Sequence, residues 1–232
     1  MKIAIMQPYF LPYIGYFQLI AAVDKFVVYD NIKYTKKGWI NRNRILLNGL
    51  DSVFTLPLKK DSDSLYVVQR ELAADFVKAK LLNKFVNAYR RAPEFDRVYP
   101  WLEQIVLCNE SNLFRYIYQS IVRLCENLGI KTEIMISSDI AINHKLKGQD
   151  KVIALCKSLG SLTYINAVGG IELYSKGDFR QHGIDLRFMK PNPIEYDQFS
   201  APFVPWLSIV DVLMFNSQDR VCDYISKSYE LV

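Results

Sequence analysis

The chain has 232 residues, of which 50% are hydrophobic and 13% aromatic, enough to bury the core of one large domain. The formal net charge of +5 is mild and the basic residues form no long run, which suits an anionic small-molecule ligand at least as well as a nucleic acid. The N-terminus lacks the pattern of a signal peptide, and no apolar run approaches the roughly 20 residues of a membrane span. We therefore expect a cytoplasmic protein with no membrane insertion.

The four cysteines are scattered, with no CxxC pair, as is typical of reduced thiols in the cytosol. No metal-ligating set is identified in the sequence, and a structural zinc site is not expected. Whether the protein requires a metal stays open.

The first 44 residues are the most informative part of the chain. A short apolar strand at 1–6 leads through a loop at 7–16 into a helix at about 17–23. Strand, loop and helix form the first crossover of an α/β sheet, and such sheets bind ligands beyond the carboxyl ends of their strands. Gly15 permits close approach of backbone or ligand at the helix start. The loop side chains expected to line a pocket are Gln7, Tyr9, Tyr13 and Tyr16. The alternative is an ordinary loop whose tyrosines cover the sheet edge.

The rest of the chain alternates strands with helices. Asn48-Gly49 predicts a hairpin turn, and residues 69–128 have mainly helical periodicity. This pattern predicts an α/β fold with a parallel or mixed central sheet flanked by helices. We expect a single α/β domain over residues 1–232 with a mainly helical insertion at about 69–128. Further strands are expected at 25–29, 132–137, 163–167 and 186–189, and further helices at 150–159 and 208–215.

The segment 30–44 is polar and basic. If it is a strand, alternation places Asn41 and Asn43 on one face and Arg42 and Arg44 on the other. Two guanidinium groups on one face suit a diphosphate, and Trp39 offers a surface on which a base or sugar can stack. The alternative is a solvated edge strand whose charges prevent aggregation.

A pair of glycines follows the predicted strand at 163–167. Backbone amides at Gly169 and Gly170 can cradle an oxyanion or phosphate, although a tight turn needs the same residues. Asn166 precedes the pair, and Tyr174 follows on the helix side. This loop is expected at the same sheet edge as the loop at 7–16.

The ionisable side chains offer few catalytic candidates. His144 and His182 have no acidic, Ser or Cys partner at a recognisable spacing and are expected at the surface. Asp211 lies in an apolar run, so it needs a partner if it is buried. A solvent-facing helix position is the alternative. Asp30 ends the second predicted strand.

Four motifs together resemble the WbqC-like protein family over nearly the whole chain. They are Met6-Gln7-Pro8-Tyr9-Phe10-Leu11-Pro12-Tyr13-Ile14-Gly15-Tyr16, Asn41-Arg42-Asn43-Arg44, Tyr164-Ile165-Asn166 with Gly169-Gly170, and Leu207-Ser208-Ile209-Val210-Asp211-Val212-Leu213-Met214-Phe215-Asn216. The resemblance implies a role in bacterial surface-polysaccharide (O-antigen) biosynthesis. It also implies transfer of glycine or a similar acyl group to the amino group of a nucleotide-linked, dTDP-type 4-amino-4,6-dideoxy sugar.

A looser resemblance concerns the nucleotidyltransferase superfamily, whose first strand is followed by an HxGH loop. Here Tyr13 and Tyr16, around Gly15, stand at the two histidine positions. Tyrosine can hydrogen-bond a phosphate but is a poor substitute for an imidazole in stabilising phosphoryl transfer. Two sources of activated acyl group therefore remain open: ATP with Mg²⁺, or an externally activated donor such as glycyl-tRNA.

The leading hypothesis is an amide-forming transferase. The attacking amine needs a base, for which Asp30 is the first candidate and Asp211 the second, with Tyr13 as a further catalytic group. Arg42 and Arg44 would hold the diphosphate, and Gly169-Gly170 would stabilise developing negative charge. Two alternatives are an ATP-dependent nucleotidyltransferase and a non-catalytic sugar-nucleotide-binding protein of the same pathway. The sequence does not define an oligomeric state.

Overall fold

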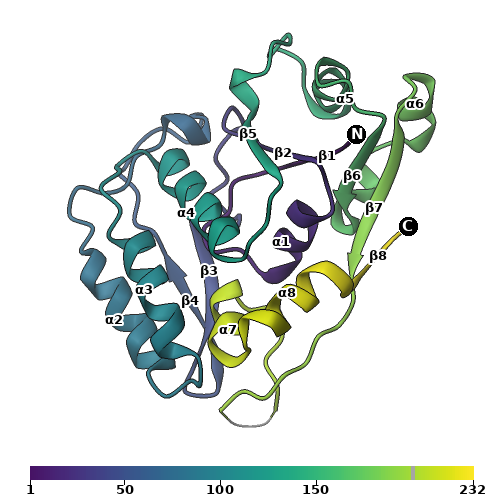
Figure 1. The fold of residues 1–232 in the computed structure, drawn as a ribbon. Helices are drawn as coiled ribbons and strands as arrows, with labels where there is room; N and C mark the ends of the chain where they lie inside the picture. The colour runs from purple at the N-terminus through teal and green to yellow at the C-terminus, as the bar shows by residue number, and fades with distance from the viewer. Residues whose placement is uncertain (200–201) are drawn as a thin grey trace.

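A six-stranded, mostly parallel sheet forms the centre of the computed structural model, which describes residues 1–199 and 202–232 (Figure 1). The strand order is β5-β2-β1-β6-β7-β8, and only β8 runs antiparallel to its neighbour. This confirms the predicted α/β class. The strands are β1 (Lys2–Met6), β2 (Lys25–Val28), β5 (Glu133–Ile136), β6 (Thr163–Ala167), β7 (Asp185–Pro191) and β8 (Tyr229–Leu231).

Alternating side chains of the strands feed two separate hydrophobic cores. Ile3 and Ile5 of β1 point to the core shared with α5 (Gly148–Ser158) and α6 (Lys176–Gln181). Ala4 points to the larger core, which contains α1 (Ile14–Ala21) and α8 (Gln218–Lys227). Helices therefore cover both faces of the sheet, as parallel strands require.

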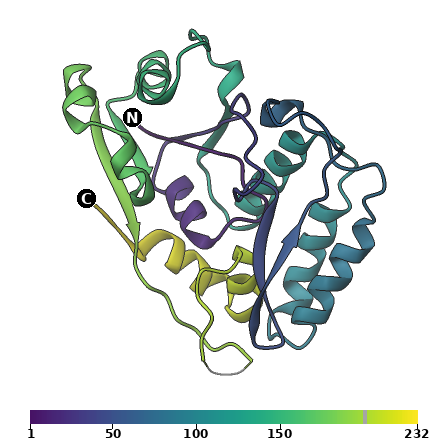
Figure 2. The same ribbon diagram turned by 180° about the vertical axis from the view of Figure 1, so that it is seen from behind.

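A two-stranded hairpin stands apart from the main sheet. β3 (Arg42–Leu47) and β4 (Leu50–Thr55) pair antiparallel through the Asn48-Gly49 turn. Both turn residues have positive φ, 54° and 77°, as expected for the type I′ turn that such a pair favours. Figure 2 shows the hairpin beside α2 (Lys78–Tyr89) and α3 (Phe95–Val106).

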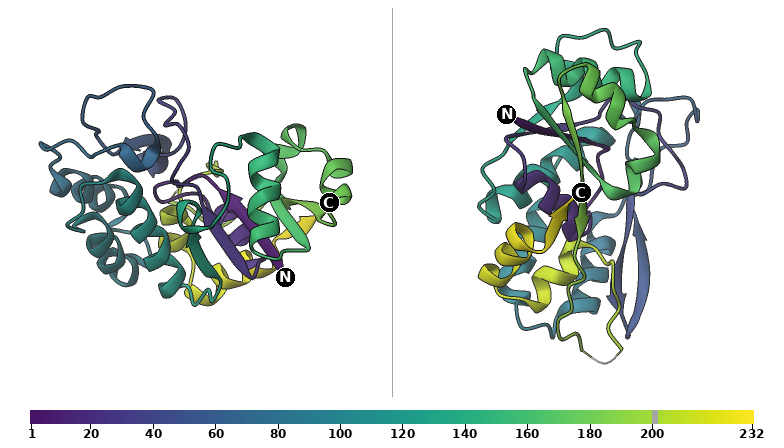
Figure 3. Two further views of the ribbon diagram at one scale, coloured as in Figure 1. Left: turned by 90° about the horizontal axis from the view of Figure 1, so that it is seen from above. Right: turned by 90° about the vertical axis from the view of Figure 1, so that its right-hand side faces the viewer.

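The predicted helical region contains three helices. The α2 and α3 helices are followed by α4 (Leu113–Asn127), whose first turn is capped by the Asn112 side chain. Figure 3 shows these helices at the opposite end of the molecule from α5 and α6. Helix α7 (Ile209–Phe215) packs between α3 and α8. No helix among the described residues is long and apolar enough to cross a membrane.

The register between β1 and β6 opens a crevice in the sheet. These two strands pair only at Lys2↔Thr163 and Ile3↔Tyr164, whereas β1 and β2 stay paired as far as Met6↔Val28. The carboxyl ends of β1 and β6 therefore separate. The chain also reverses its direction of winding between these strands, which is the position where open α/β sheets bind ligands.

Candidate functional site

A large cavity of about 1080 Å³ lies at the carboxyl ends of β1 and β6. This volume is slightly above the usual range of about 300–1,000 Å³ for small-molecule sites. Gln7 and Tyr9 contribute from the loop after β1, and Asn166, Gly169, Gly170 and Tyr174 contribute from β6 and the segment after it. The structure thus brings the loop at 7–16 and the glycine pair together.

The walls of the large cavity are strongly cationic. Four lysines and one histidine line it, and no aspartate or glutamate is among its lining residues. Such a wall favours anions, because the charged side chains that line it are lysines. The lysines are Lys33, Lys145, Lys147 and Lys151, and the histidine is His144.

The glycine pair lies in a 3₁₀ helix, Val168–Leu173, at the edge of the large cavity. A Cβ atom at Gly170 would lie 2.4 Å from Nδ2 of Asn166. Glycine at this position therefore allows the Asn166 amide to lie against the backbone at the cavity wall.

A hydrogen-bond network supports the opposite wall of the large cavity. Nζ of Lys151 donates to Oδ1 of Asn31 at 2.6 Å, and Nδ2 of Asn31 lies 3.1 Å from Nδ1 of His144. Because the amide nitrogen is the donor, His144 Nδ1 accepts, and its Nε2 donates to the Ile140 carbonyl at 3.0 Å. Both ring nitrogens of His144 are thus engaged, which argues against this side chain as a free base. Sequence reasoning missed Asn31 and Lys151.

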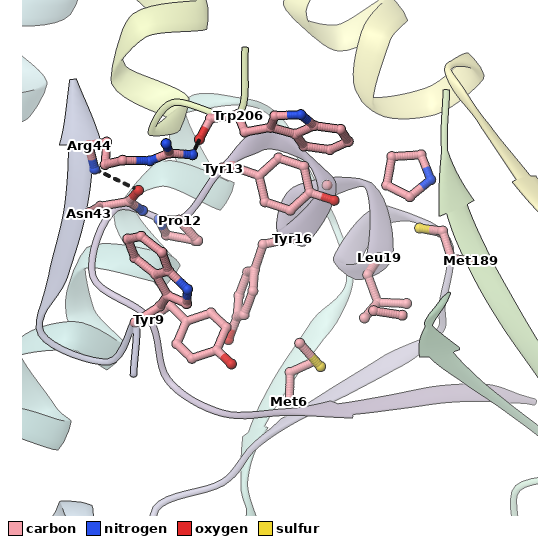
Figure 4. A pocket seen from close by; sticks show the side chains of 14 residues that line it. Met6, Tyr9, Pro12, Tyr13, Tyr16, Leu19, Asn43, Arg44, Met189 and Trp206 are labelled. Atoms are coloured by element: carbon pink, nitrogen blue, oxygen red, sulfur yellow. Dashed lines mark hydrogen bonds between the residues drawn. The ribbon is translucent and has the colours of Figure 1, made fainter. Parts of the chain in front are cut away.

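A smaller cavity of about 290 Å³ adjoins the large one. Met6, Tyr9 and Ala167 line both cavities, so the two meet at the ends of β1 and β6. The walls of the smaller cavity are mainly aromatic and apolar (Figure 4). They include Tyr9, Tyr13, Tyr16, Leu19, Trp39, Met189 and Trp206, with Asn43 and Arg44 as polar members.

The Tyr13 side chain folds back over the start of α1. A Cβ atom at Gly15 would lie 1.9 Å from the Tyr13 hydroxyl oxygen, so any other residue here requires the Tyr13 ring to move. Burial raises the pKa of Tyr13 to about 12, and Tyr13 is therefore protonated at neutral pH. It can donate a hydrogen bond but cannot act there as a phenolate base. Tyr16 donates to the Gln7 carbonyl at 2.9 Å, which fixes the loop.

Two residues beside the smaller cavity have left-handed backbone, Leu11 with φ 46° and Trp206 with φ 60°. Such conformations cost free energy in residues other than glycine and are held by their surroundings. The Leu11 carbonyl accepts from Asn43 Nδ2 at 2.8 Å and from the Ser208 hydroxyl at 2.7 Å. The hairpin and the start of α7 thus clamp the loop that carries Tyr13.

The two arginines of β3 share a face with Trp39. The guanidinium carbons of Arg42 and Arg44 lie 5.3 Å and 5.7 Å from the centre of its ring. Arg44 lines the smaller cavity, where it is paired with Asp51 at 3.0 Å and donates to the Trp206 carbonyl at 3.2 Å. Arg42 lines neither cavity, and its Nε donates to the Gly38 carbonyl at 2.9 Å.

Asn41, one of two buried asparagines in the segment 30–44, is hydrogen-bonded within the fold. Asn41 accepts from the Tyr34 hydroxyl at 2.9 Å and donates to the Leu56 carbonyl at 2.8 Å. It lines neither cavity. The predicted alternation holds, since Asn41 and Asn43 are buried while Arg42 and Arg44 lie on the opposite, more exposed face.

The two candidate carboxylates lie outside both cavities. Asp30 is buried and accepts from the Ser137 hydroxyl at 2.7 Å and from the Ser138 amide at 3.0 Å. Asp211 is fully buried among three donors. It accepts from the hydroxyls of Tyr89 and Tyr196 at 2.8 Å and 2.7 Å and from Gln198 at 2.7 Å. The catalytic roles of both carboxylates stay predictions.

No group of three or more His, Cys, Asp or Glu side chains that could hold a metal ion occurs among residues 1–199 and 202–232. A nucleotide ligand could still bring a cation on its phosphates.

Comparison with known proteins adds a family and one curated relative. The model of the WbqC-like protein family matches residues 7–222. Rv1507c of Mycobacterium tuberculosis (strain H37Rv), described as an uncharacterized protein, is 29% identical over 229 residues, which cover 97% of each chain. No solved structure matches the chain.

Proposed function

The chain belongs to the WbqC-like protein family, and from that premise we propose that it is an amide-forming transferase that acts on a nucleotide-linked amino sugar. The acceptor is a 4-amino-4,6-dideoxyhexose on a nucleoside diphosphate, of the dTDP type. The acyl group is glycine or a similar small acid. The product belongs to surface-polysaccharide synthesis.

The observation that supports this proposal is the meeting of two cavities of opposite chemistry at one sheet edge. The large cavity is lined by four lysines and no carboxylate, which suits a diphosphate. The adjoining smaller cavity offers the rings of Tyr16, Trp39 and Trp206, against which the C–H face and methyl group of a dideoxy sugar can pack. A sugar nucleotide joins these two chemistries in one molecule.

The reaction forms one C–N bond. The neutral sugar amine attacks the carbonyl carbon of the activated acyl group, and the leaving group departs with its bonding electron pair. The proton released by the amine goes to the leaving group or to water. Tyr13, protonated in the smaller cavity, would donate a hydrogen bond to the carbonyl oxygen as negative charge develops. Asp30 and Asp211 are assigned no part in removing the amine proton, because neither lines a cavity.

The test supplies dTDP-4-amino-4,6-dideoxyglucose with glycine and ATP·Mg²⁺ in one reaction, and with glycyl-tRNA in another. Mass spectrometry should find an acceptor heavier by one glycyl unit under one donor condition. The matched control acceptor carries a hydroxyl in place of the 4-amino group and should not react. A Tyr13→Phe variant should lose activity, whereas Arg42→Ala, outside both cavities, should keep it. Absence of product with every donor would exclude the transferase.

A second candidate is a sugar-nucleotide-binding protein without catalysis. The specific observation in its favour is that no carboxylate lines either cavity, which leaves no acidic general base among the lining residues. Tight binding of the sugar nucleotide with no turnover under either donor condition would select this candidate.

A further inference from the structure

Lys151 has little exposed surface and no carboxylate partner within residues 1–199 and 202–232. It is 6% exposed, lines the large cavity, and forms no ion pair with any described residue. Its nitrogen donates to Oδ1 of Asn31 and lies 5.2 Å from the centre of the Tyr29 ring. Burial lowers the pKa of Lys151, and the charge of Asp30 offsets this in part. A buried charge with no counter-ion is costly, and a bound anion would remove that cost.

The same wall contains the start of α5. Lys147 and Gly148 at its N-terminus line the large cavity, and no side chain caps the first turn. The first N–H groups of a helix and its dipole favour an anion at this position. Asp150 lies in the first turn, but it is exposed and does not line the cavity. Lys151 and the N-terminus of α5 thus belong to the same helix and line the same cavity.

The position of Lys151 is fixed by residues from other elements. Asn31, just after β2, is held by His144, which is itself tied to the Ile140 carbonyl before α5. The Ser137 hydroxyl lies 3.1 Å from Oδ1 of Asn31 as well. A donor held this firmly is already organised for a ligand, which reduces the entropy lost on binding.

We propose that Lys151, oriented by Asn31, forms with the first turn of α5 a phosphate subsite that binds the diphosphate of a nucleoside diphosphate ligand. This assignment rests on the proposed function in one respect, that the diphosphate belongs to the sugar nucleotide. The subsite separates the roles of the basic residues: Lys151 binds phosphate, whereas Arg42 and Arg44 stay with Trp39 on the hairpin. A nucleoside monophosphate would reach this subsite with only one phosphate group.

The test measures binding of TDP, TMP and inorganic pyrophosphate to the full chain by titration calorimetry. Lys151→Met should weaken TDP binding by about 10- to 100-fold, the usual effect of losing a charged hydrogen bond, and should weaken TMP binding less. Lys157→Met is the matched control. It removes the same charge from the last turn of the same helix, where Lys157 is exposed and outside the cavity, and should leave TDP binding nearly unchanged.

A second variant guards against a folding defect in Lys151→Met. Asn31→Asp keeps Lys151 but places a carboxylate against it, so it should weaken TDP binding to a similar extent. Equal TDP affinity in wild type, Lys151→Met and Asn31→Asp would overturn the subsite, as would an equal loss in Lys157→Met. Absence of both TDP and pyrophosphate binding to the wild type would also overturn it.

These outcomes are separable from failure of the proposed function. Pyrophosphate binding that depends on Lys151, without any glycyl transfer, would support the phosphate subsite and exclude the transferase function. Glycyl transfer together with TDP binding that does not depend on Lys151 would support the transferase function and exclude the phosphate subsite.

Discussion

Lys151 and Asp211 are both buried charged side chains, but their surroundings differ. Three donors from Tyr89, Tyr196 and Gln198 surround the Asp211 carboxylate, which touches neither cavity. Lys151 donates to two oxygens of Asn31, one of the side chain and one of the backbone, is paired with no carboxylate among the described residues, and lines the largest of the described cavities. The difference shows how a structural charge can be told from a binding charge. A charge with a structural role has its hydrogen-bond partners within the fold. A charge that binds a ligand has no counter-ion until the ligand is present.

The largest effect should come from removing the Asp211 carboxylate. Asp211→Ala leaves two buried tyrosine hydroxyls and one amide without an acceptor, which should lower the free energy of unfolding by about 3 kcal/mol. Lys151→Met removes a buried unpaired charge and should leave the free energy of unfolding unchanged or raised. Denaturant titration of both variants measures the contrast. An equal loss of stability in Lys151→Met and Asp211→Ala would contradict the assignment of a binding role to Lys151 and a structural role to Asp211.

The next largest effect should separate the two cavities. Gly15→Ala places a methyl group where the Tyr13 ring lies, so the ring must move within the smaller cavity. Affinity for dTDP-4-amino-4,6-dideoxyglucose should fall about tenfold, on the order of the cost of one overpacked side chain. TDP affinity should not change, because neither residue lines the large cavity. Loss of TDP binding to the same extent would contradict the division of the ligand between the cavities.

The pH dependence of stability tests whether the Asp211 carboxyl has a raised pKa in the folded state. Burial raises the pKa of its carboxyl above the ordinary 3.8, although three hydrogen bonds oppose the shift. Between pH 3.8 and the raised pKa the folded state therefore binds more protons than the unfolded chain, so stability falls as pH rises through this window. Asp211→Asn should lack this component. A difference between wild type and Asp211→Asn that does not vary across acidic pH would contradict the raised pKa.

The smallest effect should distinguish the two hairpin arginines. Arg44 lines the smaller cavity, so Arg44→Ala should weaken sugar-nucleotide binding about threefold to tenfold, within the range of a partly exposed polar contact. Arg42→Ala should change the affinity less than about twofold, because Arg42 lines neither cavity. Titration of both variants with the same sugar nucleotide measures this. A larger loss of affinity in Arg42→Ala than in Arg44→Ala would indicate that the diphosphate binds at the hairpin.

Local patterns in the sequence predicted the elements that position the site. The apolar strands at 1–6 and 163–167 and the Asn48-Gly49 turn lie where expected, because each depends on neighbouring residues. The same reasoning brought Gln7, Tyr9 and the glycine pair to one sheet edge. Helix α8 and strand β8 were not expected, since the first is strongly polar and the second has only three residues.

The roles of individual polar side chains could not be predicted in this way. Asp211 meets Tyr89, a residue 122 positions away, and no local pattern reports such a partner. Lys151 belongs to an amphipathic helix whose lysines would be assigned to solvent, yet it is buried because the segment after β2 places Asn31 over it. The basic run His144-Lys145-Leu146-Lys147 ahead of Gly148 was the one available signal. The roles proposed for Asp30 and Tyr13 stay predictions.

The most direct test of the account is a crystal structure of the chain with dTDP-4-amino-4,6-dideoxyglucose bound. Both phosphates should lie in the large cavity near Lys151 and the start of α5, with the hexose against Trp39 and Tyr16 in the smaller cavity. Phosphates bound by Arg42 and Arg44 on the hairpin, with the large cavity empty, would contradict it.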